Sequence, residues 1–242
     1  MSTLSSMLRD CLALLYPAHC VACGKLLEGR VEWICIPCRA DIPLTHFHID
    51  PANPMTSRLK DIFPQVESAT AMFYYINKGK WRNVIHEMKY NNSWLSAVKM
   101  GIWYGSDLKE SPIYQDIDVV IPVPLHFSRL LKRRYNQAEK IAEGISKAMG
   151  IKLCRHTLRR IRNNPSQVTQ TKDQRWSNVQ GLFAARNTKQ LRGKHILLVD
   201  DVFTTGATIS ACIEALIKAI PDCRISVATL AVSRNEILGT MI

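Results

Sequence analysis

Long apolar runs are missing from this chain of 242 residues: no stretch of about eighteen uninterrupted apolar residues occurs in it. A membrane-spanning helix is therefore not predicted. Residues 1–16 also lack the basic start and long apolar middle of a secretory signal peptide, so we expect a cytoplasmic protein. Hydrophobic residues make up 47% of the chain, which excludes a mostly disordered protein.

Acidic residues are scarce in one segment of the sequence. Residues 121–194 contain 17 Lys and Arg but only three acids, a balance of +14, whereas the remainder has a balance of −2. The net charge of +12 therefore arises in this segment. A field of this sign suits pyrophosphate or nucleic acid, and an ordinary solvated basic surface is the alternative.

The nucleotide-binding loop of P-loop ATPases, Gly-x-x-x-x-Gly-Lys-[Ser/Thr], is also absent. A different pattern follows the apolar run 196–199, which predicts a strand buried on both faces of a parallel sheet. Asp200 and Asp201 come next, at the carboxyl end of this strand, where open α/β sheets bind ligands. Neighbouring carboxylates accept hydrogen bonds from ribose hydroxyls or hold a metal through water. The alternative to a sugar-phosphate site is that the two acids form only a metal site.

The residues that follow have the composition of an anion-binding loop. They are Thr204, Thr205, Gly206, Ala207 and Thr208. The loop offers successive backbone N–H groups and three hydroxyls, and a helix predicted to begin near Ile209 points its positive end at the same place. Segment 196–208 resembles the phosphoribosyl pyrophosphate (PRPP) signature of type I phosphoribosyltransferases. The resemblance implies that the two acids bind the ribose and that the loop binds the 5′-phosphate.

The surrounding pattern predicts an α/β fold. Strands are expected over 69–76, 117–123, 196–199 and 224–232, and helices over 94–109 and 209–219 and around the helically spaced apolar residues of 81–88 and 138–145. We therefore expect a type I phosphoribosyltransferase-like parallel sheet flanked by helices, with a small zinc ribbon before it. The expected divisions are a helix and zinc ribbon over 1–42, a proline-containing linker over 43–68, and the phosphoribosyltransferase-like domain over 69–242.

Two Cys-x-x-Cys pairs near the amino terminus form a metal-binding pattern. The four cysteines are Cys20, Cys23, Cys35 and Cys38, with eleven residues between the pairs. This spacing predicts a structural Zn²⁺ site, and disulfides or an iron–sulfur cluster are the alternatives. Residues 1–70 are not basic overall, so we expect a structural or protein-docking role rather than the reading of duplex DNA.

A polar, basic loop follows the predicted strand 117–123. The resemblance places the pyrophosphate here, and our candidate residues are Pro124, Leu125, His126, Arg129, Lys132 and Arg133. Leu125 and His126 replace the Asp-x-Gly often found in this loop. For His126 we consider three roles: a hydrogen-bond donor to phosphate, a proton carrier, or a loop residue that contacts the backbone.

The stretch from 151 to the strand at 196 is too long and polar for a simple turn. In the resembled enzymes a flexible hairpin here closes over PRPP and shields the developing sugar cation from water. Our candidates for contact with the diphosphate or an acceptor are Arg159, Gln167 and Arg175.

Taken in order, the cysteine pairs, residues 75–90, 122–139 and 167–183, and the signature resemble the ComF family of bacterial competence proteins, including its GntX-type members. The resemblance implies PRPP binding with Mg²⁺, a role in handling single-stranded DNA during natural transformation, and a helicase-like ATPase as partner. One departure is Arg134, which stands where the family commonly has glycine, before the aromatic-Asn-Gln run.

Three functions remain open at this stage. The protein transfers a phosphoribosyl group to an unidentified acceptor; or it binds nucleic acid, with PRPP as an effector; or its zinc ribbon docks a partner. Trp81, Trp94 and Tyr135 lie among the basic residues and are compatible with single-strand binding, although their spacing also suits a helix core.

Overall fold

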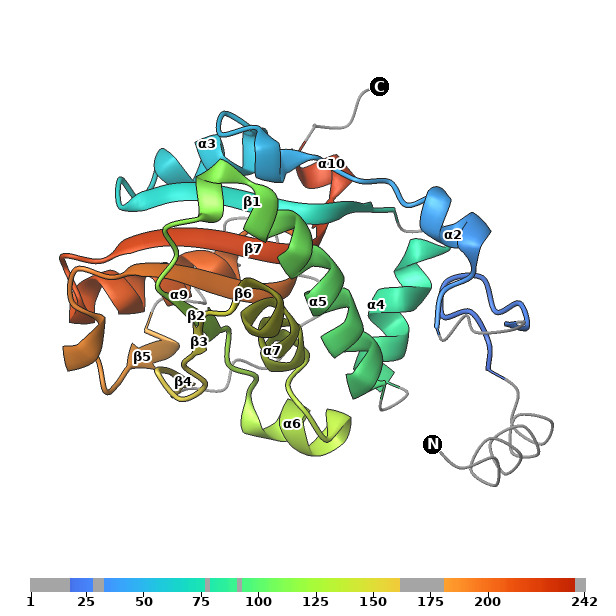
Figure 1. The fold of residues 1–242 in the computed structure, drawn as a ribbon. Coiled ribbons are helices and arrows are strands. Elements are labelled where there is room, and N and C mark those ends of the chain that lie inside the picture. The colour runs from blue at the N-terminus through green and yellow to red at the C-terminus, as the bar shows by residue number, and fades with distance from the viewer. Residues whose placement is uncertain (1–17, 28–32, 77–78, 91–92, 162–180, 238–242) are drawn as a thin grey trace, which may run out of the picture.

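The computed structural model describes residues 18–27, 33–76, 79–90, 93–161 and 181–237. At its centre lies a five-stranded sheet in the order β1-β7-β6-β2-β3 (Figure 1). The strands are β1 (Val66–Tyr75), β7 (Arg224–Ser233), β6 (His195–Phe203), β2 (Val119–Pro122) and β3 (Lys152–Leu153). Every neighbouring pair is parallel, which confirms the expected α/β fold class.

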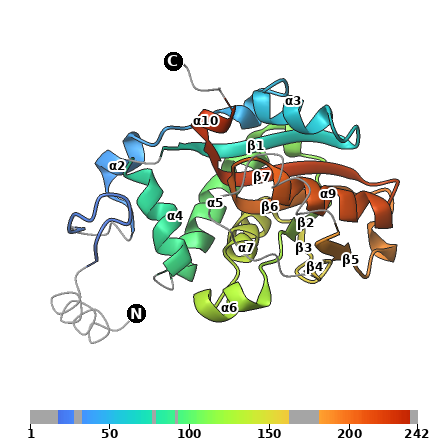
Figure 2. The same cartoon turned by 180° about the vertical axis from the view of Figure 1, so that it is seen from behind.

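Helices cover both faces of this sheet (Figures 1 and 2). They are α2 (Ile36–Ala40), α3 (Pro54–Lys60), α4 (Trp81–Tyr90), α5 (Trp94–Glu110), α6 (Phe127–Arg133), α7 (Gln137–Met149), α9 (Ala207–Ala219) and α10 (Arg234–Ile237), with short 3-10 turns η1 (Phe47–Ile49), η2 (Pro112–Tyr114) and η3 (Lys189–Leu191). Ile196 and Leu198 of β6 pack in the cluster that includes α3 and α9. Leu197 and Val199 pack in the cluster that includes α4, α5 and α7. The apolar run of β6 therefore reflects a strand buried on both faces.

Close backbone packing joins α5 to α7. A Cβ on Gly144 of α7 would lie 2.2 Å from the carbonyl oxygen of Val98, and a Cβ on Gly101 of α5 would lie 2.2 Å from that of Ile141. Both distances are far below van der Waals contact, so only glycine permits the two helix backbones to approach this closely. This contact supports α7, whose first turn lies beside the candidate site.

Within the described residues the predicted strands and helices are confirmed, with two differences at the candidate site. Strand β6 continues through both aspartates to Phe203, because Asp200 pairs with Thr229 and Val202 pairs with Ala231 of β7. Helix α9 begins at Ala207, two residues earlier than predicted, because Gly206 adopts the left-handed conformation at its N-cap with φ +82°.

A small antiparallel pair, β4 (Leu158–Arg160) and β5 (Phe183–Ala185), forms the base of the polar insertion. The insertion itself, residues 162–180, lies outside the described residues together with the candidates Gln167 and Arg175. Residues 1–17, which include the expected amino-terminal helix, also lie outside them.

The stretch 43–68, for which we predict a linker, contains η1 and α3. Asn53 caps α3 by accepting hydrogen bonds from the backbone N–H groups of Met55 and Thr56. Met55 and Leu59 are fully buried in the cluster that includes β1. The division of the chain into domains stays a prediction. In the described part of the chain, the helices lack the length and apolar character that a bilayer span needs.

Candidate functional site

Two carboxylates lie at the carboxyl end of β6. The Asp201 backbone N–H donates to Asp200 Oδ1 at 2.8 Å, so the first carboxylate is turned back toward the chain. Asp201 Oδ2 lies 2.9 Å from Nζ of Lys89, the penultimate residue of α4. Burial raises the pKa of Asp200 to about 8, and the neighbouring charge of Asp201 adds to the increase. The pair is thus one carboxyl group that resists ionisation beside one that is paired with a lysine.

The loop after β6 has the geometry of an anion cradle. The backbone N–H groups of Thr204, Thr205 and Gly206 have no backbone acceptor among the described residues. The N–H of Ala207 reaches only Thr205 Oγ1, at 3.5 Å. A Cβ on Gly206 would lie 2.8 Å from Phe203 Cζ, and its positive φ also favours glycine. The thirteen-residue helix α9 follows directly, so its positive end adds to the local potential.

Arg58 of α3 donates hydrogen bonds to this loop and to the residues after β7. Its Nη2 donates to the carbonyl oxygen of Thr205 at 2.9 Å, and its Nη1 donates to that of Glu236 at 3.2 Å. With the Thr205 carbonyl bonded on this side, the loop backbone is held in one orientation. This hydrogen bond therefore contributes to the conformation of the loop seen here.

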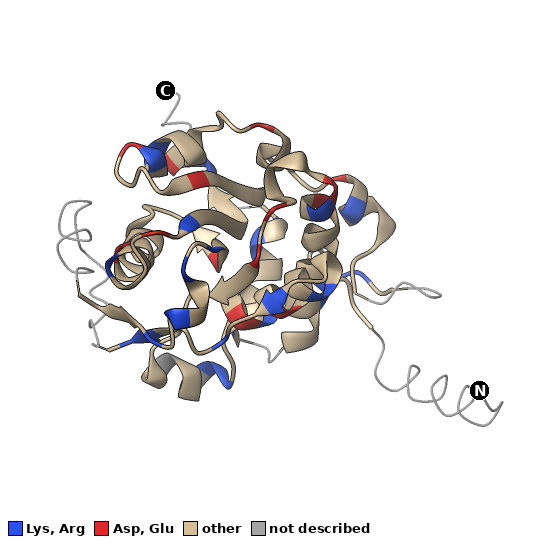
Figure 3. Cartoon of the chain, turned by 60° about the vertical axis from the view of Figure 1, so that its left-hand side comes forward, with Lys and Arg blue, Asp and Glu red and all other residues tan. Residues whose placement is uncertain are grey.

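A cavity of about 150 Å³ lies beside the two aspartates. It is lined by Lys89, Val123, Pro124, Leu125, Arg133, Asn136, Gln137, Ala138, Arg160, Asp200, Asp201, Val202 and Thr208. Three cations thus share this cavity with two carboxylates. Elsewhere, segments with Lys and Arg alternate with segments with Asp and Glu over the visible part of the molecule (Figure 3).

The run Tyr135-Asn136-Gln137 connects three parts of the cavity wall. The Tyr135 hydroxyl and Gln137 Nε2 both donate to the carbonyl oxygen of Met88 in α4, the latter at 3.3 Å. Asn136 Nδ2 donates to the carbonyl oxygen of Val123 at 3.0 Å, just after β2. Gln137 Oε1 in turn accepts from Arg133 Nη1 at 3.0 Å. These bonds fix the carboxyl end of β2 against the end of α4 that carries Lys89.

His126 is the N-cap of α6, and its Nδ1 accepts from the backbone N–H of Ser128 at 3.2 Å. It is not among the residues that line the cavity. Of the three roles considered for His126, the structure shows contact with the backbone. Arg134 ends α6 with φ +65°, the left-handed conformation that favours glycine.

The candidate residues are therefore only partly gathered in one place. Asp200, Asp201, Thr208, Pro124, Leu125 and Arg133 share the cavity. Arg129 and Lys132 belong to α6, but their side chains lie outside the described part of the structure. Arg159 is on β4 and is exposed. The roles assigned to all of these residues stay predictions.

Sequence reasoning missed Lys89, Asn136, Gln137 and Arg160 as site residues. Asn136 and Gln137 could have been identified from the sequence, because they follow the basic loop at the start of a helix. Nothing in the sequence indicated Lys89, because the apolar spacing of α4 identifies only the buried face of that helix and Asp201 is far away in the sequence. Trp81 and Tyr135 are 4% and 8% exposed, so neither is available as a surface for stacking bases.

The four cysteines of the amino-terminal module come together. Their sulfur atoms all lie within 4.8 Å of one another, and the Cys23 and Cys35 sulfurs are 3.8 Å apart. About 3.8 Å is the sulfur–sulfur separation expected around one tetrahedral Zn²⁺ with Zn–S bonds of about 2.3 Å. The four cysteines are free rather than paired as disulfides. The backbone N–H of Cys35 also approaches the Cys20 sulfur at 3.4 Å, as expected for a thiolate ligand. The cluster fits a zinc ribbon.

This module packs against the first turn of α4. Asn83 Nδ2 donates to the carbonyl oxygen of Ala22 at 2.9 Å, and Trp81 Nε1 donates to that of Asp41 at 3.2 Å. Cys20 and Cys38 are buried in the same cluster as Trp81. Helix α4 therefore contacts the cysteine module at one end and the aspartate pair at the other.

Comparison with known proteins gives one family match and several similar proteins. The phosphoribosyl transferase domain family matches residues 135–237. The chain is 27% identical to competence protein F of Haemophilus influenzae over 139 residues, 56% of this chain and 61% of that protein. It is 24% identical to the DNA utilization protein YhgH of Salmonella typhimurium over 210 residues, which cover 86% of this chain and 87% of that protein.

A third relative is competence protein ComFC of Bacillus subtilis, 31% identical over 121 residues, half of this chain and 47% of that protein. The chain thus spans less than two thirds of two of these relatives and most of the other. The residues matched by the domain family, 135–237, include β6, the signature loop, α9 and β7. These matches support a ComF-family protein with a phosphoribosyltransferase-like domain.

Proposed function

We propose that this protein binds PRPP, or a closely related phosphorylated ribose, together with Mg²⁺ at the carboxyl end of β6. We further propose that it acts in the cytoplasm in the handling of single-stranded DNA during DNA uptake, with a helicase-like ATPase as partner. The phosphoribosyl transferase match and the names of the relatives, which refer to competence and DNA utilization, support this proposal.

One observation carries the ligand assignment: the aspartate pair is followed at once by a braced loop whose amides have no backbone acceptor among the described residues. Carboxylates that accept hydrogen bonds from hydroxyls and amides that donate hydrogen bonds to a phosphate thus lie next to each other, as the two ends of ribose 5-phosphate require. Lys89, Arg133 and Arg160 line the cavity on the side of the aspartates. They provide positive charge for the diphosphate on the anomeric carbon.

In this proposal each group of the site has one task. Asp200 and Asp201 orient the ribose hydroxyls, and the loop Thr204–Thr208 binds the 5′-phosphate. Arg133 and its neighbours Pro124 and Leu125 form the wall toward the pyrophosphate. The two carboxylates are oxygen donors of the kind that Mg²⁺ prefers, and Mg²⁺ carried by PRPP neutralises charge on the diphosphate.

Isothermal titration of the protein with Mg²⁺-PRPP tests the assignment. We expect Asp201→Asn to weaken binding by about ten- to a hundredfold, because hydrogen bonds to a charged group are worth about 1.5–3 kcal/mol. Asp222→Asn is the matched control, since Asp222 is exposed and lies just before β7, at the end of the strands opposite the site. Equal affinity of wild type and Asp201→Asn for Mg²⁺-PRPP would contradict the assignment.

The alternative function is transfer of the phosphoribosyl group to an unidentified acceptor. The three cations beside the carboxylates favour it, because they lie where the charge of a departing diphosphate would be stabilised. Incubation with PRPP, Mg²⁺ and pools of metabolites or oligonucleotides separates the two readings. Release of pyrophosphate that Asp201→Asn abolishes identifies a transferase, whereas saturable binding without release identifies PRPP as an effector.

A further inference from the structure

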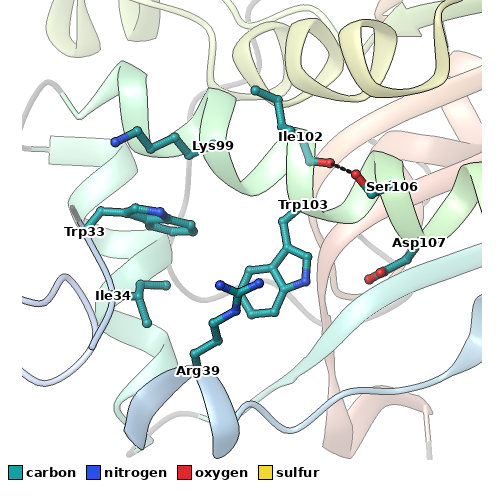
Figure 4. Close-up of a pocket in the computed structure, with 8 residues that line it drawn as sticks. All are labelled: Trp33, Ile34, Arg39, Lys99, Ile102, Trp103, Ser106 and Asp107. Carbon is teal, nitrogen blue, oxygen red and sulfur yellow. Dashed lines mark hydrogen bonds between the residues drawn. The ribbon is translucent and has the colours of Figure 1, made fainter. Parts of the chain in front are cut away.

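A second cavity lies between the cysteine module and α5. It has a volume of about 530 Å³, within the range of about 300–1,000 Å³ found for small-molecule sites. Its lining residues are Trp33, Ile34, Arg39, Lys99, Ile102, Trp103, Ser106 and Asp107 (Figure 4). None of them lines the cavity beside the aspartates. It is therefore a separate site.

Two indole rings form its walls. Trp33 comes from the segment between the two cysteine pairs, and Trp103 comes from the middle of α5. Their ring centroids are 6.4 Å apart and the ring planes are nearly perpendicular, at 79°. Both side chains are only partly buried, and the carbonyl oxygen of Trp33 accepts from the backbone N–H of Val21 at 3.0 Å. The walls are thus aromatic, partly open, and fixed to the cysteine module on one side.

Positive charge lies next to these rings. The guanidinium of Arg39 is over the Trp103 ring, 5.0 Å from its centroid. Lys99 precedes Trp103 by one helical turn and also lines the cavity, with its ammonium end on the side of Trp33 (Figure 4). A guanidinium plane on an indole is itself a surface on which a flat ligand stacks. The cavity therefore combines three flat or aromatic groups with two cations.

Hydrogen-bond acceptors occupy one end of the cavity. Asp107 contributes a carboxylate, and Ser106 contributes a hydroxyl that donates to the carbonyl oxygen of Ile102 at 3.0 Å (Figure 4). A purely apolar ligand would cover the Asp107 carboxylate without giving it a hydrogen-bond donor, which is costly. A cationic ligand would face both Arg39 and Lys99. A flat heterocycle with N–H donors at its edge and an attached anion is complementary to the indole rings, the cations and the carboxylate that line the cavity.

We propose that this cavity binds a nucleotide, with its base against Trp33, Trp103 and Arg39, and its phosphate beside Lys99 and Arg39. Asp107 accepts from an amino group of the base. Stacking of a base on an aromatic side chain is worth enough to account for tenfold or more in affinity at each ring. The nucleotide site does not depend on the proposed PRPP site, since the two share no lining residue.

Tryptophan fluorescence tests the proposal, with adenosine monophosphate and a short single-stranded oligodeoxyadenylate as the two probes. We expect saturable quenching in wild type, and affinity weaker by about tenfold or more in Trp103→Leu and in Lys99→Gln. Lys99→Gln keeps a good helix former at a partly buried position, so it separates loss of binding from loss of fold.

Trp94→Phe is the matched control. Trp94 begins the same helix, is 46% exposed and also has a cation over its ring, Lys140 Nζ at 5.5 Å, but it is outside the cavity. Binding of the monophosphate identifies a free nucleotide as the ligand. Binding of the oligonucleotide alone, with a log–log salt slope of about −1.4 for two cations, identifies a single strand.

The proposal is overturned if neither probe binds, or if Trp103→Leu and Lys99→Gln both bind like wild type. Loss of quenching in Trp94→Phe with retained affinity in the two cavity variants also contradicts it. Asp201→Asn should keep nucleotide binding, and Lys99→Gln should keep PRPP binding. Failure at one site is in this way distinguishable from failure at the other.

Discussion

At the scale of single residues, the most informative group is Asp200. Its pKa is raised from 3.8 to about 8 by burial and by Asp201, so at pH 7 it is largely protonated without ligand. A carboxylate that accepts a ribose hydroxyl has to give up this proton. We therefore predict that binding of Mg²⁺-PRPP releases up to one proton at pH 7, and that affinity rises as pH increases from about 6 to about 8.

Calorimetry in buffers of different ionisation enthalpy measures this proton directly. In Asp200→Asn the release should disappear, since the amide has no proton to lose in this range. Binding without proton exchange in wild type would show that Asp200 stays protonated in the complex, and that our assignment of its role is wrong.

Arg134 is the second informative residue. It occupies the left-handed region with φ +65° at a position where the resembled family commonly has glycine. This conformation costs a residue with a Cβ roughly 1–2 kcal/mol. Glycine avoids that cost, but its unfolded chain has more conformational entropy, which offsets part of the gain in stability. We predict that Arg134→Gly raises the free energy of unfolding by about 0.5–1 kcal/mol, measured by urea denaturation.

The control for this change is Arg192→Gly. Arg192 is also an exposed arginine, but its φ is −61°, so glycine brings no relief there and only adds unfolded-state entropy. The control should lower the free energy of unfolding. A decrease in both variants would mean that the left-handed conformation of Arg134 stores no strain.

At the scale of elements, the contact between α5 and α7 determines where the first turn of α7 lies. A methyl group on Gly144 would lie 2.2 Å from the Val98 carbonyl oxygen, with backbone atoms of Ile102 and Gly101 at 2.7 and 2.8 Å. Backbone cannot move aside as a side chain does. We predict that Gly144→Ala lowers the free energy of unfolding by about 1–3 kcal/mol, because the helices are forced apart.

Gly79→Ala is a suitable comparison in the same thermal or urea experiment. The nearest atom to a Cβ there is Ile76 Cβ at 3.4 Å, an ordinary contact, and its φ is not positive. A change of less than about 0.5 kcal/mol is expected for this variant. If both alanine variants are equally stable, the close approach of α5 and α7 is not a constraint on the fold.

At the scale of the whole molecule, local pattern was enough for the sheet and for the signature loop. The apolar run of β6, its two acids and the glycine at the start of α9 are consecutive in the chain, so their arrangement follows from neighbouring residues. The four cysteines were predictable for the same reason, since two tight knuckles need only one short connection.

Contacts between distant elements could not be predicted in this way. Lys89 meets Asp201 only because α4 and β6 are brought together by the folded core, and a helical pattern of apolar residues does not predict which residue a lysine outside that pattern contacts. Trp33 and Trp103 likewise line one cavity although they come from the cysteine module and α5. The resemblance made His126 a candidate for the pyrophosphate loop; in the structure its Nδ1 caps α6, and its role in binding stays a prediction.

The central claim is that the end of β6 and its loop bind a phosphorylated ribose. A crystal structure of the protein grown with Mg²⁺-PRPP tests it most directly. We predict density for the ribose with its hydroxyls within hydrogen-bond distance of Asp200 and Asp201, and for the 5′-phosphate against the backbone amides of Thr204–Thr208. A complex in which this loop is empty while the ligand lies elsewhere would contradict the account.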